Sequence, residues 1–159
     1  MIFVTVGAQM PFDRLIEAMD TWAAAHPEMQ VVAQIGTTDY EPQHMEWSRL
    51  LDPAVFRERM SSAQVIVAHA GMGTILTALE LGKPILVMPR RGDLRETRND
   101  HQMATAQRFD KLGRVATATD PEQLGEQLAR LADRAAEEPI SNRASDTLID
   151  ALRRFVARD

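Results

Sequence analysis

The amino-acid sequence predicts an α/β fold, a Rossmann-like parallel sheet with helices on both faces. Short apolar runs rich in β-branched residues recur along the chain, and the segments between them have the length and apolar period of helices. One unit shows this clearly, because residues 65–67 and 85–88 are such runs and a glycine turn and one helix-length segment lie between them. Two parallel strands need a crossover of that kind, so the unit implies a buried parallel sheet.

Composition indicates a globular protein of one domain. The 159 residues are 45% apolar and 26% charged, which suffices for one core but not for two nucleotide-binding domains. No apolar run reaches the length of a membrane span, and the first seven residues predict a strand instead of a signal peptide. The net charge of −5 argues against broad binding to nucleic acid, and the lack of cysteine suits the cytosol. We therefore expect a single cytoplasmic domain over residues 1–159.

The first part of the chain predicts strand, helix and strand. Residues 2–6 form a β-rich run, and Gly7-Ala8-Gln9 follows it as a glycine turn. Residues 30–35 form the next β-rich run. Between the two strands, Pro11 suits a first helical turn, and an apolar stripe recurs every three or four positions at Phe12, Leu15, Met19 and Trp22.

A loop and a short helix are expected next. Residues 39–47 are polar and without period, which predicts a loop. Asp52-Pro53 has the pattern of a helix cap followed by a first-turn proline. The helix is expected to run to Met60 and to be broken by Ser61 and Ser62.

Three helices and one strand are expected after the central unit. Asn99-Asp100-His101-Gln102 opens one helix, residues 115–119 form the last strand, and Asp120-Pro121 opens another helix. A terminal helix is expected over about residues 141–157, after a break at Pro139. The inward apolar residues of the three helices are Met103, Ala106, Phe109 and Leu112, then Leu124, Leu128, Leu131 and Ala135, then Leu148, Ile149, Leu152, Phe155 and Val156.

Gly71 and Gly73 lie where the central strand meets its helix. Their missing Cβ atoms allow a ligand oxygen to approach backbone N–H groups at the positive end of the helix dipole. The sequence therefore predicts an anion site here, most simply for a phosphate.

Glu80 lies seven residues after Gly73, which at about 100° per residue returns it to within roughly 20° of the same helical face. Its carboxylate is then directed to the glycine loop, where it can accept hydrogen bonds from the two hydroxyls of a ribose. The alternative is a solvated helix glutamate near Lys83. Gly82 and Pro84 end the helix in the expected order.

Polar groups at two strand ends border the same region. His69 closes the central strand, so it either lies close to a ligand phosphate or sugar or simply packs at the strand end. Residues 90–98 contain four arginines after the following strand, at the edge where open α/β sheets bind ligands. Such a run is either solvated surface or holds a phosphate or carboxylate through one or two of Arg90, Arg91, Arg95 and Arg98.

The tetrad at the start of the next helix adds hydrogen-bonding side chains. Asn99 and Asp100 can serve as helix caps. Capping does not require Gln102 as well, and amide, carboxylate and imidazole groups together are typical of sites for polyhydroxylated ligands. The tetrad, including His101, therefore predicts contacts with a sugar.

Taken together, these motifs resemble the nucleotide-sugar-binding C-terminal half of family 28 glycosyltransferases. The resemblance covers essentially the whole chain and is greatest to small stand-alone subunits of two-part UDP-sugar transferases. Such subunits act in dolichol-linked N-acetylglucosamine transfer and in bacterial exopolysaccharide pathways. The motifs that carry it are Ile2-Phe3-Val4-Thr5-Val6-Gly7, Pro11-Phe12-Asp13-Arg14-Leu15-Ile16, His69-Ala70-Gly71-Met72-Gly73-Thr74, Glu80, Gly82-Lys83-Pro84, Pro89 and Asn99-Asp100-His101-Gln102.

The resemblance implies the donor-binding half of the two-domain GT-B fold, with the UDP-sugar on this half and the acceptor lipid on the other. By position it implies that Glu80 contacts the ribose and that His101 and Gln102 contact the sugar. Ala8 stands where the relatives more often have threonine, so the first loop offers only its backbone donors. The diphosphate is implied to lie against Gly7, Gln9, Gly71, Met72, Gly73 and Thr74.

The resemblance also implies metal-independent chemistry. His69 and His101 come without the carboxylate cluster that a manganese-dependent transferase shows, so no metal site and no cofactor beyond the donor substrate are expected. The diphosphate charge is then stabilised by loop amides, the helix dipole and Arg90 or Arg91. In the relatives the base comes from the other half, so no catalytic base is assigned here, with His69 as the candidate on this chain.

The sequence therefore predicts the catalytic, UDP-sugar-binding subunit of a two-component glycosyltransferase. It is expected to move glucuronic acid, glucose or N-acetylglucosamine to a lipid-linked acceptor in polysaccharide biosynthesis. A membrane-anchored partner subunit is expected to bind the acceptor and to recruit the chain to the membrane surface. The alternative is a regulatory nucleotide-binding or NAD(P)-binding Rossmann module, although Leu76 stands where the dinucleotide fingerprint after Gly73 requires glycine or alanine.

Overall fold

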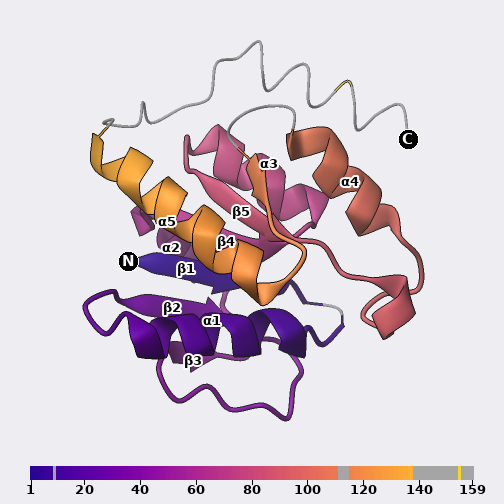
Figure 1. Ribbon diagram of the computed structural model, residues 1–159, viewed down its shortest axis with the longest axis horizontal. Coiled ribbons are helices and arrows are strands. Elements are labelled where there is room, and N and C mark those ends of the chain that lie inside the picture. Colours follow the sequence, from indigo (N-terminus) through magenta and orange to yellow (C-terminus); the bar gives the residue numbers. More distant parts are fainter. Residues whose placement is uncertain (9, 111–114, 138–153, 155–159) are drawn as a thin grey trace.

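The computed structural model describes residues 1–8, 10–110, 115–137 and 154 (Figure 1). Its strands are β1 (Ile2–Thr5), β2 (Val31–Gln34), β3 (Glu46–Ser48), β4 (Val65–His69), β5 (Ile85–Met88) and β6 (Val115–Thr117). Its helices are α1 (Asp13–Ala25), α2 (Pro53–Ser62), α3 (Met72–Glu80), α4 (His101–Asp110) and α5 (Pro121–Glu137), with a short 3₁₀ turn η1 (Gly92–Leu94). The predicted α/β class is confirmed.

The six strands form one parallel sheet in the order β3-β2-β1-β4-β5-β6. The chain builds outward from β1 to β3, returns to place β4 beside β1, and then builds outward on the other side. The reversal between β1 and β4 pairs Ile2 with Val65 and Thr5 with Ala68. Open α/β sheets bind their ligands at this switch point, outside the carboxyl ends of the strands.

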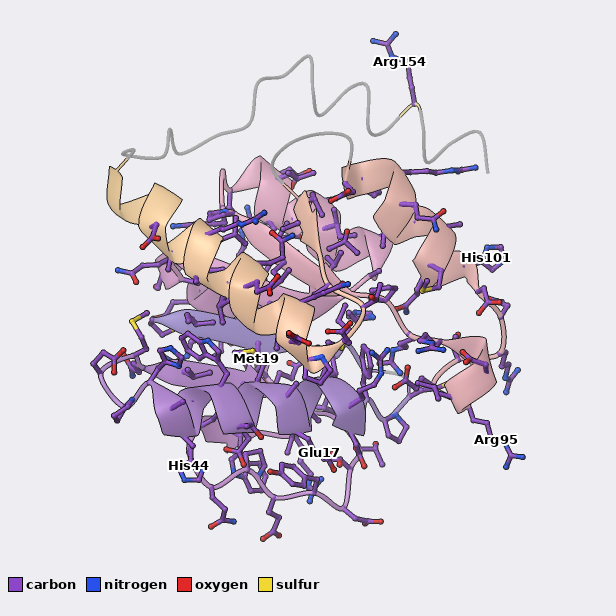
Figure 2. The ribbon with its side chains drawn as sticks, viewed as in Figure 1. Glu17, Met19, His44, Arg95, His101 and Arg154 are labelled. Carbon is purple, nitrogen blue, oxygen red and sulfur yellow. The ribbon has the colours of Figure 1, made fainter. Side chains whose placement is uncertain are left out.

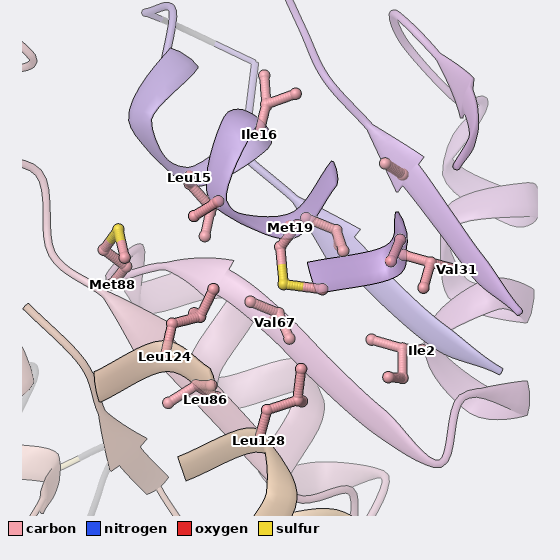
Figure 3. Packing of buried hydrophobic residues seen from close by; sticks show 14 of the residues in the cluster. Ile2, Leu15, Ile16, Met19, Val31, Val67, Leu86, Met88, Leu124 and Leu128 are labelled. Carbon is pink, nitrogen blue, oxygen red and sulfur yellow. The ribbon is translucent and has the colours of Figure 1, made fainter. Parts of the chain in front are cut away.

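Alternate residues of β1 pack against different helices. Ile2 and Val4 of β1 lie in one core with the apolar stripes of α1 and α5, whereas Phe3 lies in the other core with residues of α2, α3 and α4. Figure 3 shows the first core, where side chains of α1 and α5 pack against those of the strands. The helix residues are Leu15, Ile16, Met19, Leu124 and Leu128, and the strand residues are Ile2, Val31, Val67, Leu86 and Met88. The two cores confirm that helices cover both faces of the sheet.

The prediction of a loop over residues 39–47 is wrong for its last two residues. Glu46–Ser48 forms the edge strand β3, in which Trp47 pairs with Ala33 of β2. The strand has only three residues, and Glu46 and Ser48 are exposed. It is therefore too short and too polar to show the apolar alternation by which a strand is predicted. Pairing with the neighbouring strand creates this element, and pairing is invisible in a local pattern.

The predicted boundaries of two helices also need correction. Pro11 lies before α1, which begins at Asp13 after the buried Phe12. Ser61 and Ser62 do not break α2, because their hydroxyls donate to the carbonyl oxygens of Arg57 and Glu58, each at 2.9 Å, and remain within the helix. The three strands predicted over residues 2–6, 30–35 and 115–119 are each one or two residues shorter in the structure, at one end or both.

Other predicted features are confirmed within the described residues. Pro53 opens α2, and the Asp120 carboxylate accepts a hydrogen bond from the Gln123 backbone N–H at 2.8 Å at the start of α5. Ala106, Phe109, Leu124, Leu128 and Leu131 are buried as expected. The terminal helix over residues 141–157, Leu112 and the side chain of Ala135 lie outside the described residues, so the extent of the domain to residue 159 stays a prediction.

Candidate functional site

The carboxyl ends of β1, β4 and β5 meet at one edge of the sheet, on the right in Figure 1. Gly7 follows β1, Gly71 follows β4 and caps α3, and Arg90 follows β5. The start of α4, with His101 and Gln102, lies at the same edge. This edge is the switch point of the sheet, so it is the candidate site.

The imidazole of His69 lies between the two glycine turns. A Cβ atom on Gly7 would lie 2.8 Å from His69 Nε2, and one on Gly71 would lie 2.5 Å from the same atom. Gly7 also has φ of +75°, a conformation that other residues rarely adopt. Both positions must therefore lack a side chain for His69 to occupy this place, whereas a Cβ on Gly73 would meet nothing within 4 Å.

The His69 ring is uncharged at neutral pH. Burial is the main cause that lowers its pKa, and the nearby Arg90 guanidinium lowers it further, to about 4. His69 packs at the end of β4, as one of the two interpretations expected, and it borders both glycine turns. Its contact with a ligand phosphate or sugar stays a prediction.

Gln102 joins His69 to two neighbouring strand ends. Its Oε1 accepts hydrogen bonds from the backbone N–H of Ala70 at 3.2 Å and of Arg90 at 3.1 Å. Its Nε2 lies 3.3 Å from His69 Nδ1. The side chain thus connects α4 to the ends of both β4 and β5.

Arg90 is the buried member of the arginine run, with 4% of its surface exposed. Its guanidinium donates to the carbonyl oxygens of Val6, Pro11 and Glu96. Burial lowers the pKa of Arg90, while the Glu96 carboxylate opposes that shift. These bonds tie the end of β1 to the segment before α1 and to the loop after β5, so Arg90 shapes the site from beneath.

Arg14 and Glu96 form an ion pair that sequence reasoning missed. Arg14 Nε and Nη2 donate to the two Glu96 carboxylate oxygens, each at 2.9 Å, and Arg14 also donates to the carbonyl oxygens of Pro89 and Thr119. Glu96 accepts a further hydrogen bond from the Arg91 backbone N–H at 3.0 Å. Arg14 and Glu96 are 82 residues apart, so no local pattern joins them. The one sequence feature that could have indicated a role for Arg14 was its place in a motif of the family.

The other arginines of the run lie at the surface. Arg91 pairs with Asp93 at 2.6 Å, Arg95 is exposed in a left-handed conformation with φ of 59°, and Arg98 is exposed. Figure 2 shows Arg95 and His101 at the periphery of this edge of the molecule. The backbone N–H of exposed His101 donates to Asn99 Oδ1 at 3.1 Å, so Asn99 acts as a local cap.

The remaining predicted residues lie on α3 or before α1. Met72, Gly73 and Thr74 form the first turn of α3, whose backbone N–H groups have no partners within the helix. Glu80 is the last residue of the same unbroken helix, about 10 Å further along its axis at 1.5 Å per residue. Glu80 is half-buried, and Gln9 lies outside the described residues.

A separate hollow of about 550 Å³ lies between α1 and the start of α5. It is lined by Arg14, Glu17, Ala18, Thr21, Trp22, Ala25, His26 and Pro121. None of the predicted site residues lines it, and the ring of Trp22 is stacked on His26 there with centroids 4.1 Å apart. The predicted site, as far as the structure describes its residues, therefore lies around the glycine loops and not in this hollow.

The structure is a Rossmann-like parallel sheet with two glycine turns and a histidine at its switch point. Solved structures of GT-B glycosyltransferases share this fold. The glycotransferase of kitacinnamycin has a similar fold, with a TM-score of 0.66 and 23% identity over 99% of this chain and 39% of that one. The solution structure of ALG13 has a TM-score of 0.62 and 17% identity over 97% of this chain and 93% of that one.

The family follows from the sequence match. The model of the glycosyltransferase family 28 C-terminal domain matches residues 1–154, and the chain belongs to this family. A curated relative is the UDP-N-acetylglucosamine transferase subunit ALG13 of Yarrowia lipolytica (strain CLIB 122 / E 150), 23% identical over 142 residues, 79% of this chain and 68% of the relative. The chain spans about two fifths of the kitacinnamycin enzyme. Among the helices of the described residues, none combines the length and apolarity needed to cross a membrane.

Alanine at the two glycines of the α3 loop is expected to have opposite effects. Gly71→Ala places a Cβ against His69, so unfolding free energy falls by about 1–3 kcal/mol, as for other overpacked sites. Gly73→Ala meets open space and gains up to about 1 kcal/mol of helix stability. Urea unfolding of both variants measures the contrast, and equal stability of Gly71→Ala and the wild type would contradict the position of His69.

The lowered pKa of His69 makes stability depend on pH. The unfolded chain binds a proton below its His pKa of about 6.5, whereas the folded chain does so only near pH 4, so stability is full above pH 6.5 and falls toward pH 4. Between pH 7 and pH 5 the loss due to His69 is about 2 kcal/mol. Urea unfolding of wild type and His69→Asn at both values isolates this contribution; parallel losses in the two proteins would refute it.

Proposed function

We propose that this chain is the UDP-sugar-binding, catalytic subunit of a two-component glycosyltransferase. The observation that carries the proposal is the neutral His69 between the glycine turns at Gly7 and Gly71, beside the amino end of α3, in a family 28 domain. Backbone N–H groups at a helix start, with a neutral ring and glycine turns, form a site that favours a diphosphate.

The donor is proposed to lie along α3. Its diphosphate contacts the first-turn amides of Met72, Gly73 and Thr74 and the turn of Gly7 and Gln9. Glu80 holds the ribose hydroxyls, and Asn99, His101 and the Gln102 amide group contact the sugar. The continuity of α3 from Gly73 to Glu80 supports this order, since both ends share one helical face.

The sugar and acceptor are proposed from the chemistry of the class. N-acetylglucosamine is our choice among the three candidate sugars, because the Yarrowia relative is named a UDP-N-acetylglucosamine transferase subunit. The acceptor is proposed to be lipid-linked, as in polysaccharide biosynthesis. Its hydroxyl attacks the anomeric carbon while UDP leaves. The α3 amides bind the leaving diphosphate without a metal, and the positive charge of the buried Arg90 adds to their stabilising field.

The second half of the site is proposed to come from a membrane-anchored partner. A transferase site closes between two halves to exclude water from the activated donor, and this chain supplies one half. The partner binds the lipid-linked acceptor, provides the base and recruits the chain from the cytoplasm to the membrane surface. The Yarrowia relative is named a transferase subunit, which supports a partner for this chain.

UDP is expected to protect the chain from thermal unfolding, and NAD is not. A ligand at a hundredfold over its Kd stabilises by about 2.7 kcal/mol. Glu80→Ala is expected to weaken UDP binding by about 1.5–3 kcal/mol while the unliganded melting temperature stays close to that of wild type. Differential scanning fluorimetry with UDP, UDP-sugars and NAD measures both, and protection by NAD alone would establish the dinucleotide alternative.

A further inference from the structure

We propose that Gln102 is a positioning residue: it fixes the tautomer of His69, so that the ring presents Nε2–H to the space between the glycine turns of Gly7 and Gly71. The inference about the tautomer stands on the protein alone. Its consequence for ligand binding rests on the proposed function, because a diphosphate is the group that this donor would meet.

The orientation of the Gln102 amide follows from its backbone partners. The atom next to the N–H groups of Ala70 and Arg90 must be an acceptor, since backbone N–H groups can only donate. That atom is therefore Oε1, and the amide nitrogen is turned toward His69. Two independent donors agree on this orientation, so an exchanged amide would leave both without an acceptor.

The amide nitrogen in turn sets the ring. An NH2 group has donors and no acceptor, so the hydrogen bond at 3.3 Å runs from Gln102 Nε2 to His69 Nδ1. Nδ1 must then be unprotonated, and the single proton of a neutral imidazole lies on Nε2. The lowered pKa of His69, about 4 through burial and Arg90, agrees with a neutral ring.

The proton on Nε2 is directed at the candidate anion site. Nε2 is the ring atom nearest the missing side chain of Gly7, and it lies within 2.5 Å of where a Cβ on Gly71 would be. Gly71 caps α3, so the donor stands beside the first-turn amides of that helix. In the opposite tautomer a lone pair would face the same space and repel an anion. In this state His69 therefore serves as a hydrogen-bond donor and not as a base.

Glutamine meets both requirements in one side chain. Its oxygen accepts hydrogen bonds from Ala70 and Arg90 at the ends of β4 and β5, and its nitrogen donates to His69. A carboxylate at this position would still accept from the two backbone donors but would draw the ring proton to Nδ1. Gln102→Glu is thus a nearly isosteric change that should invert the tautomer.

The wild-type tautomer can be read directly by nuclear magnetic resonance. Long-range ¹H–¹⁵N correlation spectra of the full chain, with ¹⁵N-labelled histidine, separate protonated from unprotonated ring nitrogens. The chain has four histidines, and the signals of His69 are identified as the set that His69→Asn removes. At pH 7.5 we expect His69 to be protonated at Nε2 and unprotonated at Nδ1. Protonation at Nδ1, or at both nitrogens, would overturn the inference whatever the chain binds.

Two charge-matched variants test the role of Gln102. Gln102→Glu is expected to move the His69 proton to Nδ1 and to raise the Kd for UDP at least about tenfold. Gln107→Glu, an exposed position on the same helix, adds the same charge without reaching His69, so the tautomer and the Kd should stay unchanged.

The outcomes separate the inference from the proposed function. A switched tautomer with an unchanged Kd for UDP would overturn the link between the Nε2–H donor and the anion. An Nε2–H tautomer in a wild type that does not bind UDP would support the role of Gln102 and refute the proposed function instead. Should Gln102→Glu fail to fold, the wild-type spectrum still decides the tautomer.

Discussion

The purified chain is expected to transfer no measurable sugar to a lipid acceptor until a membrane-anchored partner is added. With the partner, the rate should rise at least about a hundredfold, equivalent to about 2.7 kcal/mol of activation free energy. The reason is the proposed two-component site, in which this half leaves the donor open to water and the partner supplies both acceptor and base. Transfer of label from a panel of UDP-sugars to lipid extract, with and without the co-purified partner, measures the effect.

The surface that contacts the proposed partner can be tested with one exposed side chain near the candidate site. Leu94 lies in η1 at the edge of the site and is 47% exposed, which is unusual for leucine in the described residues. Leu94→Asp is expected to weaken the partner complex and its activity while UDP binding by the isolated chain persists. Ala24→Asp, exposed on α1 along one face of the sheet, is the charge-matched control.

Full transfer by the chain alone, without the partner, would refute the two-component interpretation.

Arg90→Met is expected to lower the free energy of unfolding by about 3–5 kcal/mol. Methionine fills a similar volume but cannot donate, so the carbonyl oxygens of Val6, Pro11 and Glu96 lose their partner in a region with little water. The loop after β5 would then detach from the end of β1. Urea unfolding monitored by circular dichroism gives the change.

A matched control lies next in the chain. The side chain of Arg91 is 40% exposed and pairs with Asp93 on its own loop, so Arg91→Met should leave stability almost unchanged. Arg90→Lys should recover only part of the loss, because a single ammonium cannot reach three carbonyl groups in the fork geometry of a guanidinium. Equal stability of Arg90→Met and Arg91→Met would contradict the buried role of Arg90.

The arginine run shows where sequence reasoning reaches its limit. Four arginines in nine residues indicated either solvated surface or ligand contact, and the structure divides them differently. Arg90 is buried among backbone carbonyls, Arg91 pairs locally, and Arg95 and Arg98 are exposed. Two of the three carbonyl partners of Arg90 come from positions 6 and 11, far outside the run, so the run by itself does not distinguish Arg90.

The sequence by itself determined the α/β class, the βαβ unit, the two glycine turns and the family. These features depend on local periodicity and on short motifs, and both are properties of neighbouring residues. The order of the helices and strands followed with them, apart from the edge strand β3, which exists only through its pairing with β2.

The tertiary structure alone decided which groups meet at the switch point. It placed the His69 ring in the space left by Gly7 and Gly71, turned the Gln102 amide through two backbone donors, and buried Arg90 beneath the loops. Most of the hydrogen bonds that set these arrangements join residues far apart in the chain, by up to 84 positions. Their geometry depends on the strand order and on burial, which no local pattern encodes, so the tautomer of one histidine becomes a property of the whole fold.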